Sequence, residues 1–69
     1  SYMEQKEWAT IEDEIALLEE RVDALTEAMN QQGDDFTKLQ QLQAEVTETE
    51  QLLEEKMTRW EYLSEFSDD

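Results

Sequence analysis

The chain has 69 residues, with 20 acidic side chains against five basic ones for a net charge of −15, and it has no Cys, His or Pro. A chain this short buries only about 60% of its unfolded surface, which excludes a deep catalytic cavity. Without Cys and His it lacks the usual ligands of zinc, haem and iron–sulfur clusters and the commonest general base. Because so acidic a surface repels phosphate backbones and anionic lipids, we expect no duplex DNA binding and no membrane contact.

The first predicted element is a helix over about residues 2–31. Apolar residues recur there in steps of three and four, which places them on one helix face, as in the a and d positions of a coiled coil. Ser1 and Glu4 have the spacing of a capping box. Thr10 and Asp13 have it as well, but Trp8 already belongs to the apolar stripe, so we prefer Ser1 as the cap. The stripe consists of Trp8, Ile11, Ile15, Leu18, Val22, Leu25 and Met29.

A turn is predicted over about residues 32–35. Gly33 suits the left-handed position just past the end of a helix. Asp34 or Asp35 suits the N-cap of the following helix, where a carboxylate accepts from free backbone N–H groups.

The second predicted helix covers about residues 36–65. Its stripe keeps the same rhythm until Leu53, where a strict heptad puts Lys56 in the stripe and Met57 falls one residue late. We read this as a local irregularity such as a bulge or stutter. The acids of 67–69 oppose the helix dipole, so fraying is expected from about Ser64. The stripe consists of Leu39, Leu42, Val46, Thr49, Leu53, Lys56 or Met57, Trp60 and Leu63.

A short connection makes neighbouring helices antiparallel. The predicted fold is therefore all-α, one domain over residues 1–69 that forms a two-helix antiparallel coiled-coil hairpin, and we expect it to be a monomer. Two pairing registers are open. The preferred one buries both tryptophans and pairs Trp8 with Leu63, Ile11 with Trp60, Leu18 with Leu53, Leu25 with Val46 and Met29 with Leu42. The other is shifted by a heptad, pairs Leu18 with Val46 and Arg21 with Glu45, and leaves Trp60 facing Glu4.

The acidic clusters read as a solvated face, so no catalytic, cofactor-binding or metal-ligating residues are assigned. Ion pairs within one helix are expected between Glu55 and Arg59 and between Asp34 and Lys38. Aromatic and cationic side chains gather at the end where both termini meet, and they either contact a partner or simply close that end of the hairpin. The candidate contact residues are Tyr2, Lys56, Arg59, Trp60, Tyr62 and Phe66.

Several strings in the chain resemble the C-terminal domain of ABC-F ATPases of the Uup type. They are the opening run of residues 1–8, Ile11-Glu12, Ile15, Leu18-Glu19, the tip over residues 33–39 and the closing Arg59-Trp60-Glu61-Tyr62-Leu63. The closing string is the most specific, since helical periodicity does not require it. The similarity extends over nearly the whole chain.

The resemblance implies a cytoplasmic parent with two ATP-binding cassettes that acts on ribosomes, with ATP and magnesium bound outside this chain. Because the chain begins at Ser1, we expect it to be a C-terminal piece of such a parent. The leading hypothesis is a non-catalytic interaction domain that positions the parent on the ribosome, through ribosomal RNA or protein, or on another partner. The alternatives are a nucleic-acid-binding module, since DNA binding is credited to this family, and an independent coiled-coil adaptor. A linker outside the chain is expected to supply any missing positive charge.

Overall fold

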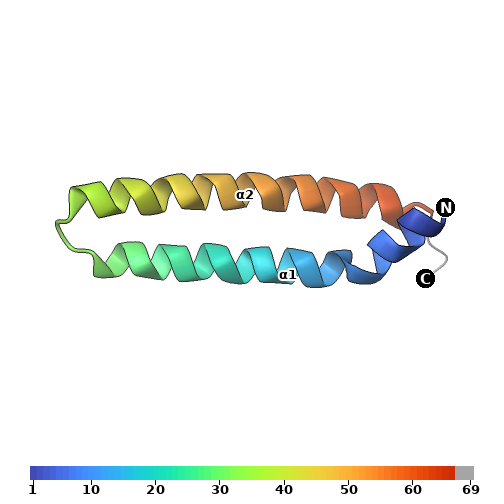
Figure 1. The fold of residues 1–69 in the computed structure, drawn as a ribbon, viewed down its shortest axis with the longest axis horizontal. Coiled ribbons are helices and arrows are strands. Elements are labelled where there is room, and N and C mark those ends of the chain that lie inside the picture. Colours follow the sequence, from blue (N-terminus) through green and yellow to red (C-terminus); the bar gives the residue numbers. More distant parts are fainter. Residues whose placement is uncertain (67–69) are drawn as a thin grey trace.

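The computed structural model describes residues 1–66. It contains two α-helices, α1 (Tyr2–Gln31) and α2 (Phe36–Ser64), joined by a turn over residues 32–35. The helices lie side by side and run in opposite directions (Figure 1). The predicted all-α helical hairpin is therefore confirmed, and α2 ends one residue earlier than expected. The fraying expected at the C-terminal end also concerned Ser67, Asp68 and Asp69, which lie outside the described residues.

Both helices begin with a side-chain cap. Ser1 Oγ accepts from the backbone N–H of Glu4 at 3.2 Å, and the Glu4 side chain completes the capping box. At the start of α2, Asp35 rather than Asp34 is the N-cap, and its carboxylate accepts from the N–H of Lys38 at 3.1 Å. These contacts satisfy backbone donors that have no partner within the first turn of a helix.

The turn between the helices depends on Gly33, which has φ of +62°. Gln32 is the C-cap of α1, so Gly33 stands at the left-handed position predicted for it. The N–H of Asp35 then donates to the carbonyl of Gln32 at 3.2 Å. We call this end of the hairpin the tip, and the opposite end, where α1 begins and α2 ends, the base.

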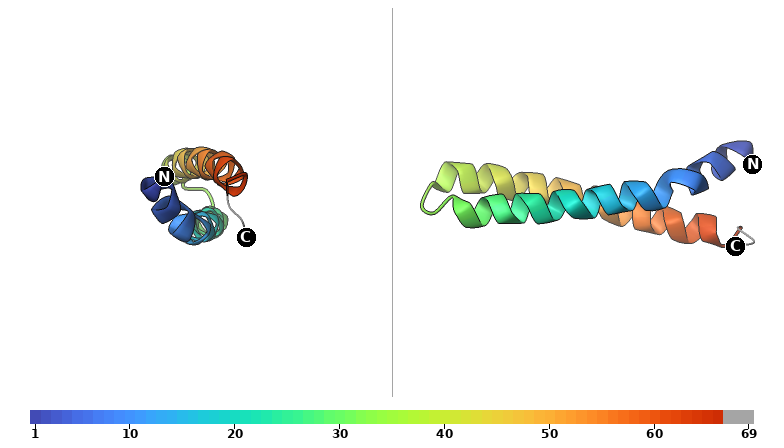
Figure 2. Two further views of the ribbon diagram at one scale, coloured as in Figure 1. Left: turned by 90° about the vertical axis from the view of Figure 1, so that its right-hand side faces the viewer. Right: turned by 90° about the horizontal axis from the view of Figure 1, so that it is seen from below.

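The hairpin is a rod of 50 × 15 × 14 Å. The first turns of α1 bend away from the axis of the rest of that helix (Figure 2). Thr10 Oγ1 donates to the carbonyl of Glu7 at 3.4 Å, a back-bonding contact of the kind that bends helices. The bent segment carries Glu4 and Glu7, and both of these carboxylates contact α2.

The apolar stripes face each other along the rod in the preferred register. Leu25 packs with Leu42 and Val46, and Met29 and Ala28 lie against this cluster. Trp60 stacks on Trp8 with ring centroids 6.0 Å apart, rather than facing Glu4. Both tryptophans are half-buried, because two helices leave one side of each ring open, so this register covers the two rings only in part.

Every residue of the predicted stripes except Met57 lies in a buried or half-buried position. Twelve of these residues form the predicted seam between the helices: Trp8, Ile11, Ile15, Leu18, Val22, Leu25, Met29, Leu39, Leu42, Val46, Leu53 and Leu63. Thr49 is also buried, and its hydroxyl donates to the carbonyl of Glu45 at 2.7 Å, which satisfies the polar group inside its own helix.

The irregularity expected near Lys56 is not present, since residues 53–63 are α-helical throughout. Lys56 occupies the strict heptad position and is half-buried, whereas Met57 is 47% exposed. A lysine can hold this position because its aliphatic stem covers apolar surface while the ammonium group reaches an acid at the edge. At residue 56 the chain therefore departs from the usual heptad pattern in its residue type, whereas the helix itself is regular.

Neither helix of the described chain is long and apolar enough to cross a membrane. Within residues 1–66 there is also no group of three or more acidic side chains arranged to hold a metal ion.

Candidate functional site

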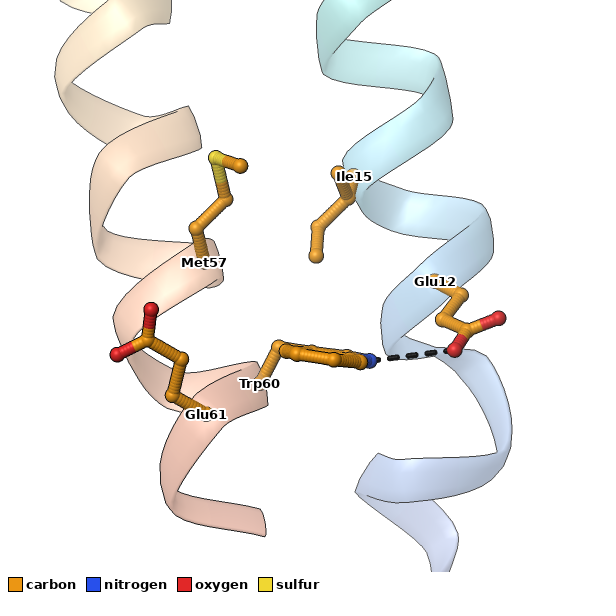
Figure 3. A pocket seen from close by; sticks show the side chains of 5 residues that line it. All are labelled: Glu12, Ile15, Met57, Trp60 and Glu61. Carbon is orange, nitrogen blue, oxygen red and sulfur yellow. Dashed lines mark hydrogen bonds between the residues drawn. The ribbon is translucent and has the colours of Figure 1, made fainter. Parts of the chain in front are cut away.

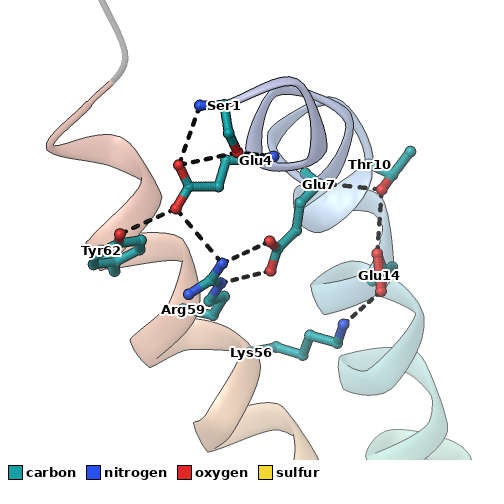
Figure 4. A network of polar contacts seen from close by, with 8 residues as sticks. All are labelled: Ser1, Glu4, Glu7, Thr10, Glu14, Lys56, Arg59 and Tyr62. Carbon is teal, nitrogen blue, oxygen red and sulfur yellow. Dashed lines mark hydrogen bonds and ion pairs between the residues drawn. The ribbon is translucent and has the colours of Figure 1, made fainter.

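The base is held together by Arg59 of α2. Its guanidinium binds the Glu7 carboxylate of α1 through two hydrogen bonds, Nε to Oε2 at 2.7 Å and Nη2 to Oε1 at 2.9 Å (Figure 4). A second carboxylate, Glu4, lies 3.9 Å from Nη2. Two parallel bonds fix the plane of the guanidinium as well as its position, so this pair orients the two helix ends.

Three further contacts extend this network along the base. The hydroxyl of Tyr62 donates to Glu4 Oε2 at 3.0 Å, and the Arg59 guanidinium lies 4.8 Å from the centroid of the Tyr62 ring. On the tip side, Lys56 Nζ pairs with Glu14 Oε2 at 2.7 Å. We call this set the base clasp: Glu4, Glu7, Glu14, Lys56, Arg59 and Tyr62.

The contacts within the base clasp shift the pKa values of the side chains that form it. The hydrogen bond from Tyr62 lowers the pKa of Glu4, that from Arg59 lowers the pKa of Glu7, and that from Lys56 lowers the pKa of Glu14. In return, the hydrogen bond to Glu4 raises the pKa of the Tyr62 hydroxyl. Each shift favours the protonation state that holds α1 to α2, and all these groups remain open to solvent.

On the other flank of the seam, the Trp60 indole lies across the base. Its Nε1–H donates to Glu12 Oε1 at 3.2 Å. The ring borders an open hollow of about 330 Å³ whose apolar lining comes from Ile15, Met57 and Trp60, with Glu12 and Glu61 beside it (Figure 3). Glu12 follows Ile11 on α1 whereas Glu7 precedes Trp8, so the hollow and the Arg59–Glu7 pair stand on opposite flanks of the seam.

The six candidate contact residues fall into two groups. Lys56, Arg59, Trp60 and Tyr62 all contact α1 through a polar atom. Tyr2 and Phe66 are 70% and 67% exposed. The Tyr2 ring has the Lys6 ammonium 5.6 Å from its centroid, and the Phe66 ring meets Tyr62 edge-on at 4.9 Å. Only the second group leaves most of its aromatic surface open to a partner.

The ion pairs expected within single helices are wrong for Arg59. Its partners are Glu7 and Glu4 of α1, not Glu55. An acid on the facing helix offers a bidentate geometry that a neighbour one turn away on the same helix does not. At Asp34 and Lys38, the contact seen at the start of α2 is instead the backbone cap from Asp35.

The pair of Arg21 and Glu45 corrects a second expectation. It forms at 3.5 Å in the observed register, although it was assigned to the shifted one. Arg21 lies two heptads beyond Glu7 on α1, and Glu45 lies two heptads before Arg59 on α2, so both pairs belong to one antiparallel register. The ion pair therefore agrees with the tryptophan contact and does not compete with it.

Sequence reasoning missed the acidic half of this site, which consists of Glu4, Glu7, Glu12 and Glu14. The sequence did hold one signal, at the heptad position beside the apolar stripe. There Glu7 and Arg21 of α1 have charges opposite to those of Arg59 and Glu45 of α2. Acids are so abundant in this chain that their charge alone did not distinguish these four.

The titratable side chains with shifted pKa values all lie in the clasp, where each has a partner within the chain. Within residues 1–66, the carboxylates of the clasp are 30–40% exposed, unlike the buried setting in which a carboxylate pair acts as acid and base. Chemically, this arrangement joins two helix ends and presents a partly apolar, acid-edged surface.

Comparison with known proteins gives two matches. Residues 1–65 match the family described as the ABC transporter C-terminal domain. The chain is also 47% identical over 64 residues to the ABC transporter ATP-binding protein YfmR of Bacillus subtilis (strain 168). That alignment covers 93% of this chain and 10% of YfmR, so the chain spans about a tenth of the length of that relative. No solved structure matches the chain significantly.

Proposed function

The chain belongs to the family of ABC transporter C-terminal domains, and from this membership we propose that it is a non-catalytic arm that positions a cytoplasmic ABC-F type ATPase on the ribosome or another partner. ATP and magnesium would be bound by cassettes elsewhere in that parent. The hairpin would act as a coiled-coil lever, held at its base.

The observation that carries the proposal is the base clasp. Arg59 joins both Glu7 and Glu4, Lys56 joins Glu14, and Tyr62 joins Glu4, so three residues near the end of α2 are fixed to the first turns of α1. A single seam between two helices gives modest stability by itself. Contacts concentrated at the base favour an arm of fixed direction, since this is the end at which a longer chain would connect.

The charge distribution supports a protein partner over duplex DNA. Three of the five basic side chains, Arg21, Lys56 and Arg59, pair with acids across the hairpin. Affinity for duplex DNA arises mainly from cations that displace condensed counterions. The alternative of a DNA-binding module is therefore not favoured for these residues, and family membership argues against an independent adaptor.

The test uses the whole protein that contains this chain, with and without residues 1–66. Both forms are sedimented with ribosomes through a sucrose cushion in the presence of ATP, and their ATP turnover is measured without ribosomes. We expect removal of the arm to reduce co-sedimentation about tenfold or more while turnover stays within about twofold. Unchanged co-sedimentation would contradict the proposal, and so would a loss of turnover, because the arm would then serve the cassettes.

A further inference from the structure

The hollow beside Trp60 combines an apolar surface with two carboxylates. Ile15, Met57 and the indole face of Trp60 are apolar, while Glu12 and Glu61 place carboxylates beside them (Figure 3). Its volume of about 330 Å³ falls at the small end of the range for ligand sites. Met57 is 47% exposed, so this apolar surface is open to water in the free chain.

The side chains of arginine and lysine have the matching composition. Their aliphatic stems cover apolar surface while the charged head stays near acids or water. The face of a tryptophan also attracts a cation that comes within about 6 Å of the ring. Since Glu12 already orients the Trp60 ring through Nε1, the apolar face and the carboxylate are held in a fixed relation before any ligand arrives.

We infer that this hollow docks a basic polypeptide segment of a partner protein, with one Arg or Lys side chain lying against Trp60 and Met57 and its charged head beside Glu12 and Glu61. The inference names the partner chemistry for the interaction role proposed above and rests on that role. The overall net charge of −15 draws such a segment toward the chain before it docks.

A nucleic acid fits the same hollow less well. Its bases would stack on the open face of the half-buried indole, but its phosphates would then approach Glu12 and Glu61. The cations closest to this end of α2, Lys56 and Arg59, are both bound to acids of α1. Charge complementarity therefore selects a basic peptide over RNA.

The test is a titration of the 69-residue chain with a synthetic peptide of alternating arginine and leucine. Isothermal titration calorimetry measures the affinity. Two matched pairs of variants distinguish binding in the hollow from non-specific attraction of the peptide to the acidic surface or to exposed apolar side chains. Glu61→Lys and Glu20→Lys change the net charge equally, but only Glu61 lines the hollow. Met57→Ser and Leu52→Ser remove apolar side chains of similar exposure, 47% and 45%, and only Met57 lines it.

We expect Glu61→Lys and Met57→Ser to weaken peptide binding about tenfold, while Glu20→Lys and Leu52→Ser stay within about twofold of the parent chain. Equal weakening by Glu61→Lys and Glu20→Lys would overturn the inference in favour of general charge attraction. Tighter binding of a single-stranded RNA oligonucleotide than of the peptide would overturn it in favour of base stacking. Circular dichroism of each variant checks that the helices remain.

This outcome is separable from that of the proposed function. If removing the arm releases the whole protein from ribosomes but the peptide does not bind the chain, the inference fails and the arm keeps its role. If the peptide binds with the expected pattern of variants while removing the arm changes no co-sedimentation, the docking site stands and the role on the ribosome fails.

Discussion

Among single residues, Arg59 does most to join the two helices at the base. It binds Glu7 through two hydrogen bonds and lies over the ring of Tyr62. Arg59 lies two heptads after Glu45 and so occupies the same heptad position, which means that its place beside the seam could be predicted from the sequence. The bidentate geometry could not, because the periodicity of the sequence does not predict the bend in the first turns of α1, which in Figure 1 rise toward the end of α2.

The contribution of the Arg59–Glu7 pair depends on pH with a definite sign. The folded-state pKa of Glu7 lies below its ordinary value of 4.5, because Arg59 binds the ionised form. A lowered pKa stabilises the fold above the unfolded value, and this stabilisation is lost as the pH falls through the folded value. In urea unfolding, we expect Arg59→Gln to lower the midpoint at pH 7, with a difference from the parent chain that shrinks as the pH falls below about 4.5.

Arg21→Gln provides the control for this series, since it changes the net charge equally. Its partner Glu45 is 3.5 Å away through a single contact, and the Arg21 side chain is 55% exposed, so we expect a smaller effect at pH 7. A difference for Arg59→Gln that is the same at pH 3 as at pH 7 would show that its effect does not depend on ionised Glu7.

Trp60 belongs both to the seam and to the surface hollow. The ring stacks on Trp8 and donates to Glu12, but it is only half-buried. We therefore expect Trp60→Ala to lower the free energy of unfolding by about 2 kcal/mol, below the roughly 3–5 kcal/mol of a fully buried tryptophan. Phe36→Ala, at a site 69% exposed, should change it by less than about 0.5 kcal/mol. Equal urea midpoints for the two variants would place Trp60 outside the seam.

At the scale of elements, the sequence predicted most of this structure because its local signals agree. The stripe of α1 keeps its rhythm over its whole length, Ser1 and Glu4 form the expected cap, and Gly33 ends the helix. The position of Lys56 misled the prediction because a charged residue in a seam looks like a break. Its ammonium group instead leaves the seam to reach Glu14.

The tip turn gives a test of backbone conformation separate from packing. A Cβ added at Gly33 would meet no atom within 4 Å, so only its φ of +62° opposes a side chain there. We expect Gly33→Ala to lower the free energy of unfolding by about 1 kcal/mol, and Gly33→Asn by less, since asparagine tolerates the left-handed region better. Thermal unfolding of both variants checks this. An alanine variant as stable as the parent chain would mean that the turn takes another conformation in solution.

At the scale of the whole molecule, most of the cations are already paired with acids at the edges of the seam. Arg21, Lys56 and Arg59 pair across the seam, so the remaining surface is more acidic than the composition alone conveys. The sequence was sufficient to predict an acidic rod. It did not predict which acids pair, because twenty candidates compete for five cations.

This distribution predicts little affinity for duplex DNA. In a titration of the 69-residue chain against a labelled duplex at physiological salt, we expect no binding at micromolar concentrations, since few cations remain to displace counterions. A single strand of the same length is the comparison, because stacking on an exposed aromatic ring is worth about 1–3 kcal/mol per base. Micromolar duplex binding that weakens steeply with added salt would contradict the account.

The length of the two helices predicts a monomer, because each seam is matched within the chain. The same helices would pair between two chains if the turn opened, since domain swapping needs little change in contacts. Sedimentation velocity at micromolar concentration separates the two forms. We expect the mass of one chain of 8.2 kDa, and a dominant dimer would contradict the prediction.

The central claim is that the chain folds back on itself so that its base closes around Trp8 and Trp60. Its two tryptophans make this directly observable, since their rings lie 6.0 Å apart and no other indole is present. The measurement is a nuclear Overhauser effect between the two indole rings, recorded with an isotope filter on a mixture of labelled and unlabelled chains. The account predicts the effect within labelled chains and none between chains. Its absence, or its appearance only between chains, would contradict the hairpin and the site built on it.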